Sequence, residues 1–455
     1  MTIMFPCRNK YLAFLLVSAS GLQLHAQTTS SLSNPRNGRD NNPYSKFGIG
    51  ELVNRNNAAV RGIANLTSTY SNTYSVNTDN PATYSFMDVQ RAVFEVGGTG
   101  QTRTTHGTVN GAETNYRTGT ATLSYMTLAV PVSRNSGFCI GFRPYSRTYY
   151  SLRDTLSKTT NPPSPLDSAE TIYKGEGSLN YAFIGGSAKY KGLSVGFNFG
   201  YLFGSQFVST QLNPYDVSNG TRSYISEYSN QTRTGGIYWK GGLLYEAKLD
   251  SFYTLRIGGT ITMDQRVKQH YLEYNIAGYN FGDTVVRDTA YYLPETRSTM
   301  TLPLSYSAGI MLTHAGKWGV GVDYTATQWS NFKSELNKTM NSGIAASSYR
   351  LALGSEYTPD ATDIKHVLSR STYRLGAYYG TEYLRLNGND ISYYGITAGM
   401  SLPFKRYQTQ VSYLHAAIEY GILGTTDAGL MRQNYLRFTL GASMTARWFD
   451  RKKYQ

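Results

Sequence analysis

The sequence has no long hydrophobic run beyond its first residues, and it carries little charge. A helix that crosses a bilayer needs roughly 18 or more mainly apolar residues, so helical membrane proteins are excluded. Only 16% of the 455 residues are charged, and neither Leu nor Ala dominates, which argues against a large helical enzyme. A soluble β-protein or a transmembrane β-barrel remains, because the half-polar strands of a barrel escape a hydropathy scan.

Cysteine is also scarce, with only Cys7 and Cys139 in the chain. Residues 1–26 have a basic start, an apolar centre and a small residue at Ala26, which is the layout of a secretory signal peptide cleaved after Ala26. Cleavage would remove Cys7, and one remaining cysteine cannot form an intramolecular disulfide. An exported chain without disulfides needs a large core or a closed sheet for its stability.

The body of the chain alternates with a period of two residues. In the last such run one face is apolar and the other carries Gly, Ser, Thr and Arg; the apolar members are Leu436, Phe438, Leu440, Ala442, Met444, Ala446 and Trp448. Similar runs surround Phe197 and Ile257. They are about twice as long as an ordinary strand and match the roughly 9–11 residues with which a tilted strand crosses a bilayer. The pattern predicts an all-β, transmembrane antiparallel β-barrel with lipid outside and a polar lumen.

Counting these runs predicts about fourteen strands in residues 91–455, and an even number returns both termini to one side. The predicted strand centres lie near residues 95, 125, 140, 184, 198, 241, 258, 306, 323, 352, 378, 397, 413 and 441. Short turns, such as Tyr190–Gly192 and Pro403–Arg406, alternate with long polar segments that we expect to be outer loops. These segments are Ser146–Ser178, Gly204–Gly235 and Arg266–Ser298.

Residues 27–90 do not fit the barrel pattern. They are rich in Asn, Ser, Thr and Gly, and are too polar to span lipid, yet about 60 residues is long for a tail. Scattered apolar residues such as Ile49 and Val60 indicate that the later part is ordered. We therefore expect a periplasmic hatch, a plug folded into the lumen, with a disordered leader as the alternative for residues 27–41.

Several short motifs carry a resemblance to a known family. They are Arg61-Gly62, Asn80-Pro81-Ala82 before the first strand, Ala129–Val132 in the second, Gly141–Ser146 in the third and Leu353–Pro359 in the tenth. In this order they resemble the FadL-type outer-membrane barrels, and more closely the Bacteroidetes branch to which PorV belongs. The resemblance implies a fourteen-stranded barrel with an N-terminal hatch that includes Arg61, Gly62, Asn80, Pro81 and Ala82. No stretch maps residue by residue onto a FadL fatty-acid pocket.

Pro144 interrupts the predicted third strand. Proline has no N–H to donate to a ladder, so it is normally excluded from the interior of a paired strand. The resemblance implies a kinked third strand that leaves a lateral gap toward the membrane. We expect Arg143, Pro144, Tyr145 and Ser146 to frame such an opening; the alternative is that the strand has already left the bilayer at Pro144.

The alternation also predicts charged residues that point into the lumen. They carry both signs and are Glu95, Arg256, Asp323, Arg350, Glu356, Arg374 and Arg437. Such groups can hydrate the lumen or cross-link a hatch, and they can equally line a substrate path. Mixed signs favour a plugged barrel over a wide ion-selective pore.

The sequence offers no support for catalysis. His415 is the one histidine in a predicted strand of the mature chain, without Ser and acid partners at a triad spacing. We expect no enzyme activity, no metal, no cofactor and no nucleic-acid partner. The leading hypothesis is a barrel in the outer membrane of a Gram-negative bacterium, in contact with its lipids, that binds or passes an apolar small molecule and releases it laterally near the third strand. The alternative is a non-transporting, PorV-like partner barrel of a secretion or assembly machine.

Overall fold

The computed structural model describes residues 40–54, 56–89, 91–109, 112–157, 168–215, 225–281, 284–336, 343–363, 365–407 and 410–447. All of them belong to one compact unit, Gly38–Gln455. The predicted signal peptide and residues 27–39 of the predicted hatch lie outside the described residues.

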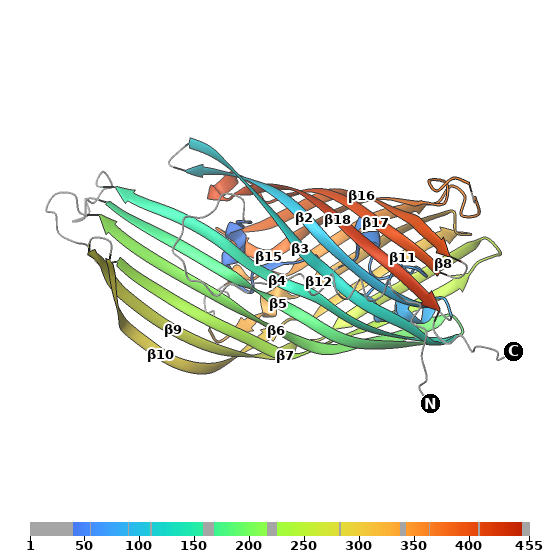
Figure 1. The fold of residues 1–455 in the computed structure, drawn as a ribbon, viewed down its shortest axis with the longest axis horizontal. Helices are drawn as coiled ribbons and strands as arrows, with labels where there is room; N and C mark the ends of the chain where they lie inside the picture. Colours follow the sequence, from blue (N-terminus) through green and yellow to red (C-terminus); the bar gives the residue numbers. More distant parts are fainter. Residues whose placement is uncertain are drawn as a thin grey trace, which may run out of the picture. The chain divides into compact units, whose positions relative to one another are not determined.

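The described strands form one antiparallel sheet that closes into a barrel of fourteen strands, as predicted (Figure 1). β18 pairs with β2 and closes the barrel. β8 and β9 both pair with β7 and together make one wall strand with a break between them. In the same way, β11 pairs with β8 and β10 pairs with β9, so β10 and β11 make the next wall strand. The wall strands are β2 (Arg91–Val109), β3 (Ala112–Ser133), β4 (Ser136–Ser157), β5 (Ser168–Tyr190), β6 (Leu193–Tyr215), β7 (Ile225–Lys248), β8 (Tyr253–Thr262) with β9 (Gln265–Phe281), β10 (Thr284–Leu302) with β11 (Ser305–His314), β12 (Trp318–Thr327), β14 (Ser348–Tyr357), β15 (Thr372–Leu386), β16 (Asn389–Tyr407), β17 (Gln410–Leu423) and β18 (Arg432–Arg447).

The remaining elements are short. They are the strands β1 (Glu51–Leu52) and β13 (Lys333–Ser334), the α-helix α2 (Ala58–Gly62) and the 3-10 helices η1 (Pro43–Lys46), η2 (Pro81–Phe86), η3 (Trp329–Asn331) and η5 (Asp427–Gly429). In the described part of the chain, no helix has the length and apolar character to cross a membrane.

The two faces of the wall have opposite character. On β6 the outward side chains Val195, Phe197 and Phe199 are exposed, whereas Ser194 and Asn198, which alternate with them, are fully buried. The same alternation holds on β18, where Phe438 is exposed and Thr439 is buried. The large apolar side chains therefore form an outer belt for lipid, and the small and polar ones face inward, as the alternation predicts.

Tight turns join the strands at one end of the barrel, here called the turn end. Lys191 and Gly192 both have positive φ, as the two central residues of a type I′ hairpin require. The predicted turn at Pro403–Arg406 is wrong, because β16 continues through these residues to Tyr407. β16 is thus longer than its apolar alternation indicates.

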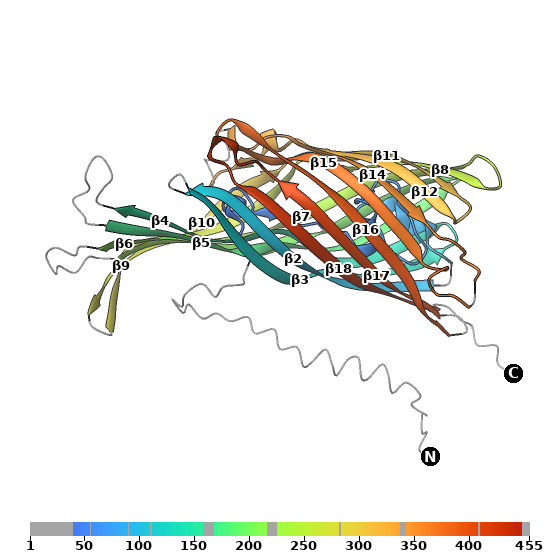
Figure 2. The ribbon, with the colours of Figure 1, turned by 90° about the horizontal axis from the view of Figure 1, so that it is seen from above.

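At the opposite end, the predicted long loops are wrong, because most of their residues are strand. β4 and β5 pair from Ser136 to Ser157, β5 and β6 pair up to Tyr215, and β9 and β10 form a hairpin over Gln265–Leu302. These strands project beyond the ends of β2 and β3 (Figure 2). We call the projecting parts of β4, β5, β6, β7, β9 and β10 the outer extension. Its strands lack the regular alternation of apolar and polar side chains that lipid imposes on the rest of the wall, so the sequence there resembles that of loops.

Candidate functional site

Residues 40–89, here called the N-terminal segment, fold into short helices that asparagines cap. The side chains of Asn42, Asn57 and Asn80 accept hydrogen bonds from backbone N–H groups in the first turns of η1, α2 and η2. Asparagine is among the best helix N-caps. The Asn-rich composition therefore produces order here, and Figures 1 and 2 show the short helices α2 and η2 enclosed by the strands.

The predicted hatch residues pack against the inner face of the wall. The Arg61 guanidinium donates to the hydroxyls of Thr99 at 2.8 Å and Thr439 at 3.1 Å. The Asn80 side-chain amide donates to the carbonyl oxygens of Ser68 at 2.6 Å and Leu243 at 3.1 Å. These bonds tie β2, β18 and β7 to the N-terminal segment.

Glycines on the wall make room for this packing. A Cβ on Gly196 of β6 would lie 2.3 Å from the carbonyl carbon of Pro81 and 2.4 Å from the nitrogen of Ala82. A Cβ on Gly62 would lie 2.9 Å from the Cα of Gly399 on β16. Part of the large glycine content is therefore explained by close approach between the backbone of the wall and that of the segment.

Two of the predicted lumen carboxylates accept hydrogen bonds from the segment. Asp323 on β12 accepts from the Ser68 N–H at 2.6 Å and from its hydroxyl at 2.8 Å. Glu95 on β2 accepts from the Val76 N–H at 3.0 Å. Both side chains are buried, so these charges are compensated by donors of the segment.

The predicted lumen arginines also reach the segment. Arg350 donates to the Ala64 carbonyl at 2.9 Å, and Arg256 donates to the Ser71 carbonyl at 3.1 Å. Arg374 donates to the Tyr70 hydroxyl at 2.9 Å and lies 3.4 Å from the carboxylate of Glu356. The structure thus brings the lumen charges into one network with the N-terminal segment, and the arrangement cross-links the segment to the wall.

The pairing of β3 with β4 ends where Pro144 interrupts β4. The ladder runs from Ser133↔Ser136 only as far as Met126↔Phe142. Beyond that pair, β4 stays bonded to β5, with a register shift between Pro144 and Ser146 that leaves Tyr145 as a bulge. The wall is therefore split between β3 and β4 from Phe142 onward.

The four residues predicted to frame an opening lie at this split, and three of them bond the N-terminal segment. Arg143 is buried and its guanidinium lies 3.1 Å from Asp79 and donates to the Thr78 hydroxyl at 2.9 Å. The Tyr145 carbonyl accepts from the N–H of Val53 at 3.1 Å, and the Ser146 hydroxyl donates to the Ile49 carbonyl at 2.7 Å.

The N-terminal segment covers the free edge of β4 along the split. Its β1 pairs with Ser146 and Arg147, and the Asn42 N–H donates to the Tyr149 carbonyl at 2.9 Å. The Asn41 side chain bonds both the N–H and the carbonyl of Ser151. The edge that β3 leaves is thus occupied by the chain's own residues 41–53.

Glu51 fixes this cover to the wall, and sequence reasoning missed it. Its carboxylate accepts two hydrogen bonds from Arg103, at 2.6 and 2.8 Å, and lies 3.4 Å from Arg437. Burial raises the pKa of Glu51, but the guanidinium groups of Arg103 and Arg437 outweigh it and hold the pKa well below the usual carboxyl value. Glu51 and Arg103 are far apart in sequence, so no local sequence pattern predicts their contact.

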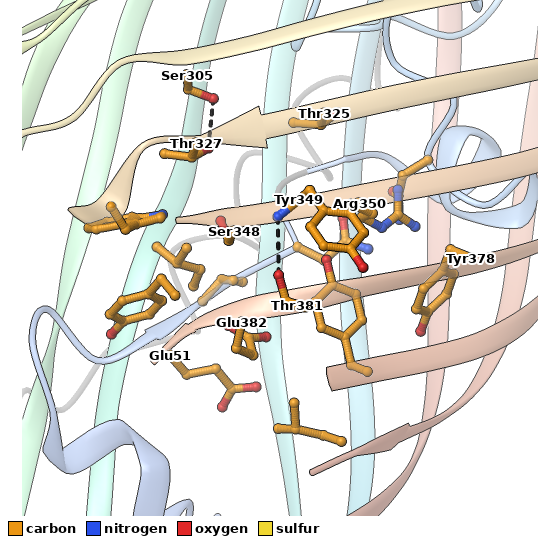
Figure 3. A pocket seen from close by; sticks show the side chains of 18 of the residues that line it. Glu51, Ser305, Thr325, Thr327, Ser348, Tyr349, Arg350, Tyr378, Thr381 and Glu382 are labelled. Carbon is orange, nitrogen blue, oxygen red and sulfur yellow. Dashed lines mark hydrogen bonds between the residues drawn. The ribbon is translucent and has the colours of Figure 1, made fainter. Parts of the chain in front are cut away.

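Described residues line a cavity at each end of the lumen. The cavity toward the outer extension, about 280 Å³, has hydroxyl groups on one wall and Glu51, Glu382, Tyr349 and Tyr378 around the rest (Figure 3). Its hydroxyl wall consists of Ser305, Thr325, Thr327 and Ser348. The cavity near the turn end, about 490 Å³, is lined by Arg256, Glu356, Arg370, Arg374 and His415 among others. Both linings combine charged and hydroxylated groups with apolar side chains, which in the first cavity include Trp329, Leu384 and Ile391.

His415 contacts two serines. Its Nδ1 lies 2.6 Å from the Ser401 hydroxyl and its Nε2 lies 2.7 Å from the Ser443 hydroxyl. Within the described ranges, no three His, Cys, Asp or Glu side chains gather as a metal ion requires. The arrangement cross-links β16, β17 and β18.

Comparison with known proteins adds a family and a fold. A family model described as BamG matches residues 15–455. No curated protein matches the sequence. A solved Pseudomonas aeruginosa FadL homologue is 16% identical, with 88% of this chain and 100% of that chain covered and a TM-score of 0.51. The Ralstonia pickettii toluene transporter TbuX is 15% identical over 86% and 98% of the two chains, with a TM-score of 0.55. The Pseudomonas putida toluene transporter TodX is 18% identical over 88% and 99%, with a TM-score of 0.50. At such identities the similarity shows a shared fold, the FadL-type barrel.

Proposed function

Because the chain belongs to the BamG family, we propose that this outer-membrane barrel of FadL type is a non-transporting partner in a machine that assembles outer-membrane proteins. The observation that carries the proposal is the closure of the split between β3 and β4. Residues 41–53 bond the free edge of β4, and Glu51 anchors them to β2 and β18.

The lumen supports the same reading. A transporter of apolar molecules needs a continuous apolar path behind Pro144. In its place Arg143, Asp79 and Lys240 form an ion-paired group, with both cations about equally close to the Asp79 carboxylate at 3.1 and 3.2 Å. An apolar ligand bound beside these charges would remove their water and offer no polar group in exchange. The desolvation penalty is on the order of several kcal/mol per ion.

The outer wall offers an apolar surface for a neighbour. A groove of about 700 Å³ runs over β12 to β18, lined by side chains such as Leu353, Leu375 and Ile396, with the small Ala377 and Ala398 at its floor. A concave apolar patch of this kind on a barrel wall suits contact with a second membrane protein or with lipid.

A pull-down of the natively expressed barrel in mild detergent tests the proposal, with proteins and extracted lipids analysed in one sample. We expect protein partners in stoichiometric amounts and no enriched apolar compound. An unrelated barrel with the same tag, purified from the same host, is the control for adventitious capture. A lone barrel that carries a defined fatty or aromatic compound would contradict the proposal.

The second candidate function is passage of an apolar small molecule with lateral release between β3 and β4. The split beyond Phe142 and the kink at Pro144 favour it. This function requires residues 41–53 to leave the β4 edge. Uptake of an apolar probe by the Pro144→Ala variant would then fall, whereas Pro131→Ala, a change within the paired part of β3, would leave uptake unchanged. Equal uptake by both variants removes the support for a functional kink.

A further inference from the structure

The sheet of the outer extension ends at two edges, and the described residues of the chain cover one of them. Residues 41–53 bond β4, as described above. The other edge is β10, which pairs with β9 on one side along its length. On its second side the described residues provide β13, opposite Met300 and Thr301, and Glu335, which bonds Thr299 through its backbone N–H and its carboxylate. Among the described residues, no other strand pairs with the second edge of β10 between Thr284 and Ser298, and the Thr289 N–H donates to the carboxylate of the neighbouring Asp288 at 2.8 Å.

The uncovered stretch has the composition of a paired strand. Thr284–Leu293 reads TVVRDTAYYL, in which β-branched and aromatic residues dominate. Val286, Tyr291 and Tyr292 are exposed by 41%, 48% and 59%. The only described interruption before Pro294 is a bulge next to Ala290. Proteins usually protect a long edge of this kind, because its free N–H and C=O groups form a template for another strand.

We propose that the edge of β10 between Thr284 and Leu293 pairs with an extended segment of a partner protein. A row of alternating N–H and C=O groups at strand spacing is satisfied by another extended backbone, and not by a lipid or a small anion. The neighbouring Arg287 and Asp288 carry opposite charges, so the edge attracts no ligand of a single sign. On the β4 edge of the same sheet the chain itself supplies a short strand of this kind, β1. The inference rests on the proposed partner function and specifies the surface and the mode of binding.

A second copy of the chain cannot pair its own β10 with this edge in an antiparallel ladder. Two copies in one membrane have the same orientation, so their β10 strands rise in the same direction at a tilt of about 35–45° to the barrel axis. Antiparallel pairing of two identical edges requires opposite directions. In line with the proposed partner function, we assign the partner segment to a different protein.

Proline variants test whether the backbone of the edge makes the contact. Neighbouring residues of a strand direct their N–H groups to opposite edges, so either Val286→Pro or Arg287→Pro removes a donor on the free edge. Val286→Thr and Arg287→Thr keep every N–H and serve as matched controls. Resistance of the folded barrel to unfolding in cold detergent, seen as faster gel migration than the boiled sample, shows that each variant is folded.

The complex is isolated from the native host in mild detergent, and amide hydrogen exchange is measured on peptides that cover residues 286–293. We expect these amides to exchange about tenfold or more slowly in the complex than in the separated barrel, while peptides from residues 113–122 of β3 exchange equally in both. One proline variant should retain less than about a tenth of the partner, and both threonine variants should retain it.

Each other outcome overturns the inference. If wild type binds its partner but residues 286–293 are unprotected, or if both proline variants bind normally, the edge is not the interface and the proposed function stands. If the isolated assembly contains only two copies of this chain, the assignment of the edge to a different protein is wrong. If wild type has no partner at all, the inference and the proposed function fail together.

Discussion

Replacement of Asp323 by alanine should loosen the N-terminal segment where it meets β12. The carboxylate accepts both the N–H and the hydroxyl of Ser68, and it is only 2% exposed. Hydrogen bonds to a charged group contribute about 1.5–3 kcal/mol each, and the Ser68 N–H would be left buried without an acceptor. Because the two bonds share one carboxylate, we expect a loss of about 2–4 kcal/mol in the local stability of the segment.

Hydrogen exchange of the peptide that contains Ser68 measures this loss. A change of about 2–4 kcal/mol corresponds to roughly 30- to 1000-fold faster exchange, since about 1.4 kcal/mol is a factor of ten. Asp390→Ala is the matched control, because it removes the same charge from an exposed pair with Arg385 beside the turn between β15 and β16. Exchange at Ser68 that stays the same in Asp323→Ala would refute the claim that this contact holds the segment.

Two further predictions concern the fit and the charge of the segment. Gly196→Val should lower the free energy of unfolding by about 1–3 kcal/mol through overlap with Pro81, whereas Gly100→Val, whose added Cβ meets no atom within 4 Å, should change it little; denaturant titration of the folded fraction on gels compares them. The lowered pKa of Glu51 stabilises the folded state fully above the ordinary carboxyl value of about 4.3, and this contribution is lost as the pH falls toward the lowered pKa. Protection of the amides of residues 41–53 from hydrogen exchange should therefore decline in acid in the wild type. In Glu51→Gln this protection should be weaker and should not depend on pH. The same dependence on pH in both proteins would contradict the role of Glu51.

The number of wall strands could be predicted from the sequence because lipid imposes a pattern. Wherever a strand faces hydrocarbon, as at Phe197 or Phe438, alternate side chains must be apolar. This alternation is present whatever side chains face the lumen. The outer extension has no such constraint. Val286 and Arg287 are both exposed, so the strand there shows no alternation and resembles a loop.

The contacts of the lumen were only partly predictable. Alternation assigns Asp323 to the inner face, but it does not name Ser68, 255 residues away, as its partner. The anchor of the segment was missed for the same reason, because Glu51 and Arg103 meet only through the closure of the barrel. Pro144 could be singled out, because its missing N–H is a local property that disturbs any ladder. That residues 41–53 cover the edge of β4 could not be predicted, because the two segments are far apart in sequence. The membership of the chain in the Bacteroidetes branch with PorV stays a prediction.

The central claim is that the N-terminal segment closes the lumen, and the electrical conductance of the purified wild-type barrel in a planar bilayer tests it most directly. A trimeric porin in the same bilayer shows that open channels are detected. The account predicts no steady ion current through the wild-type barrel, because the segment is bonded to the inner face of the wall between the two cavities. A steady conductance of porin size would contradict it.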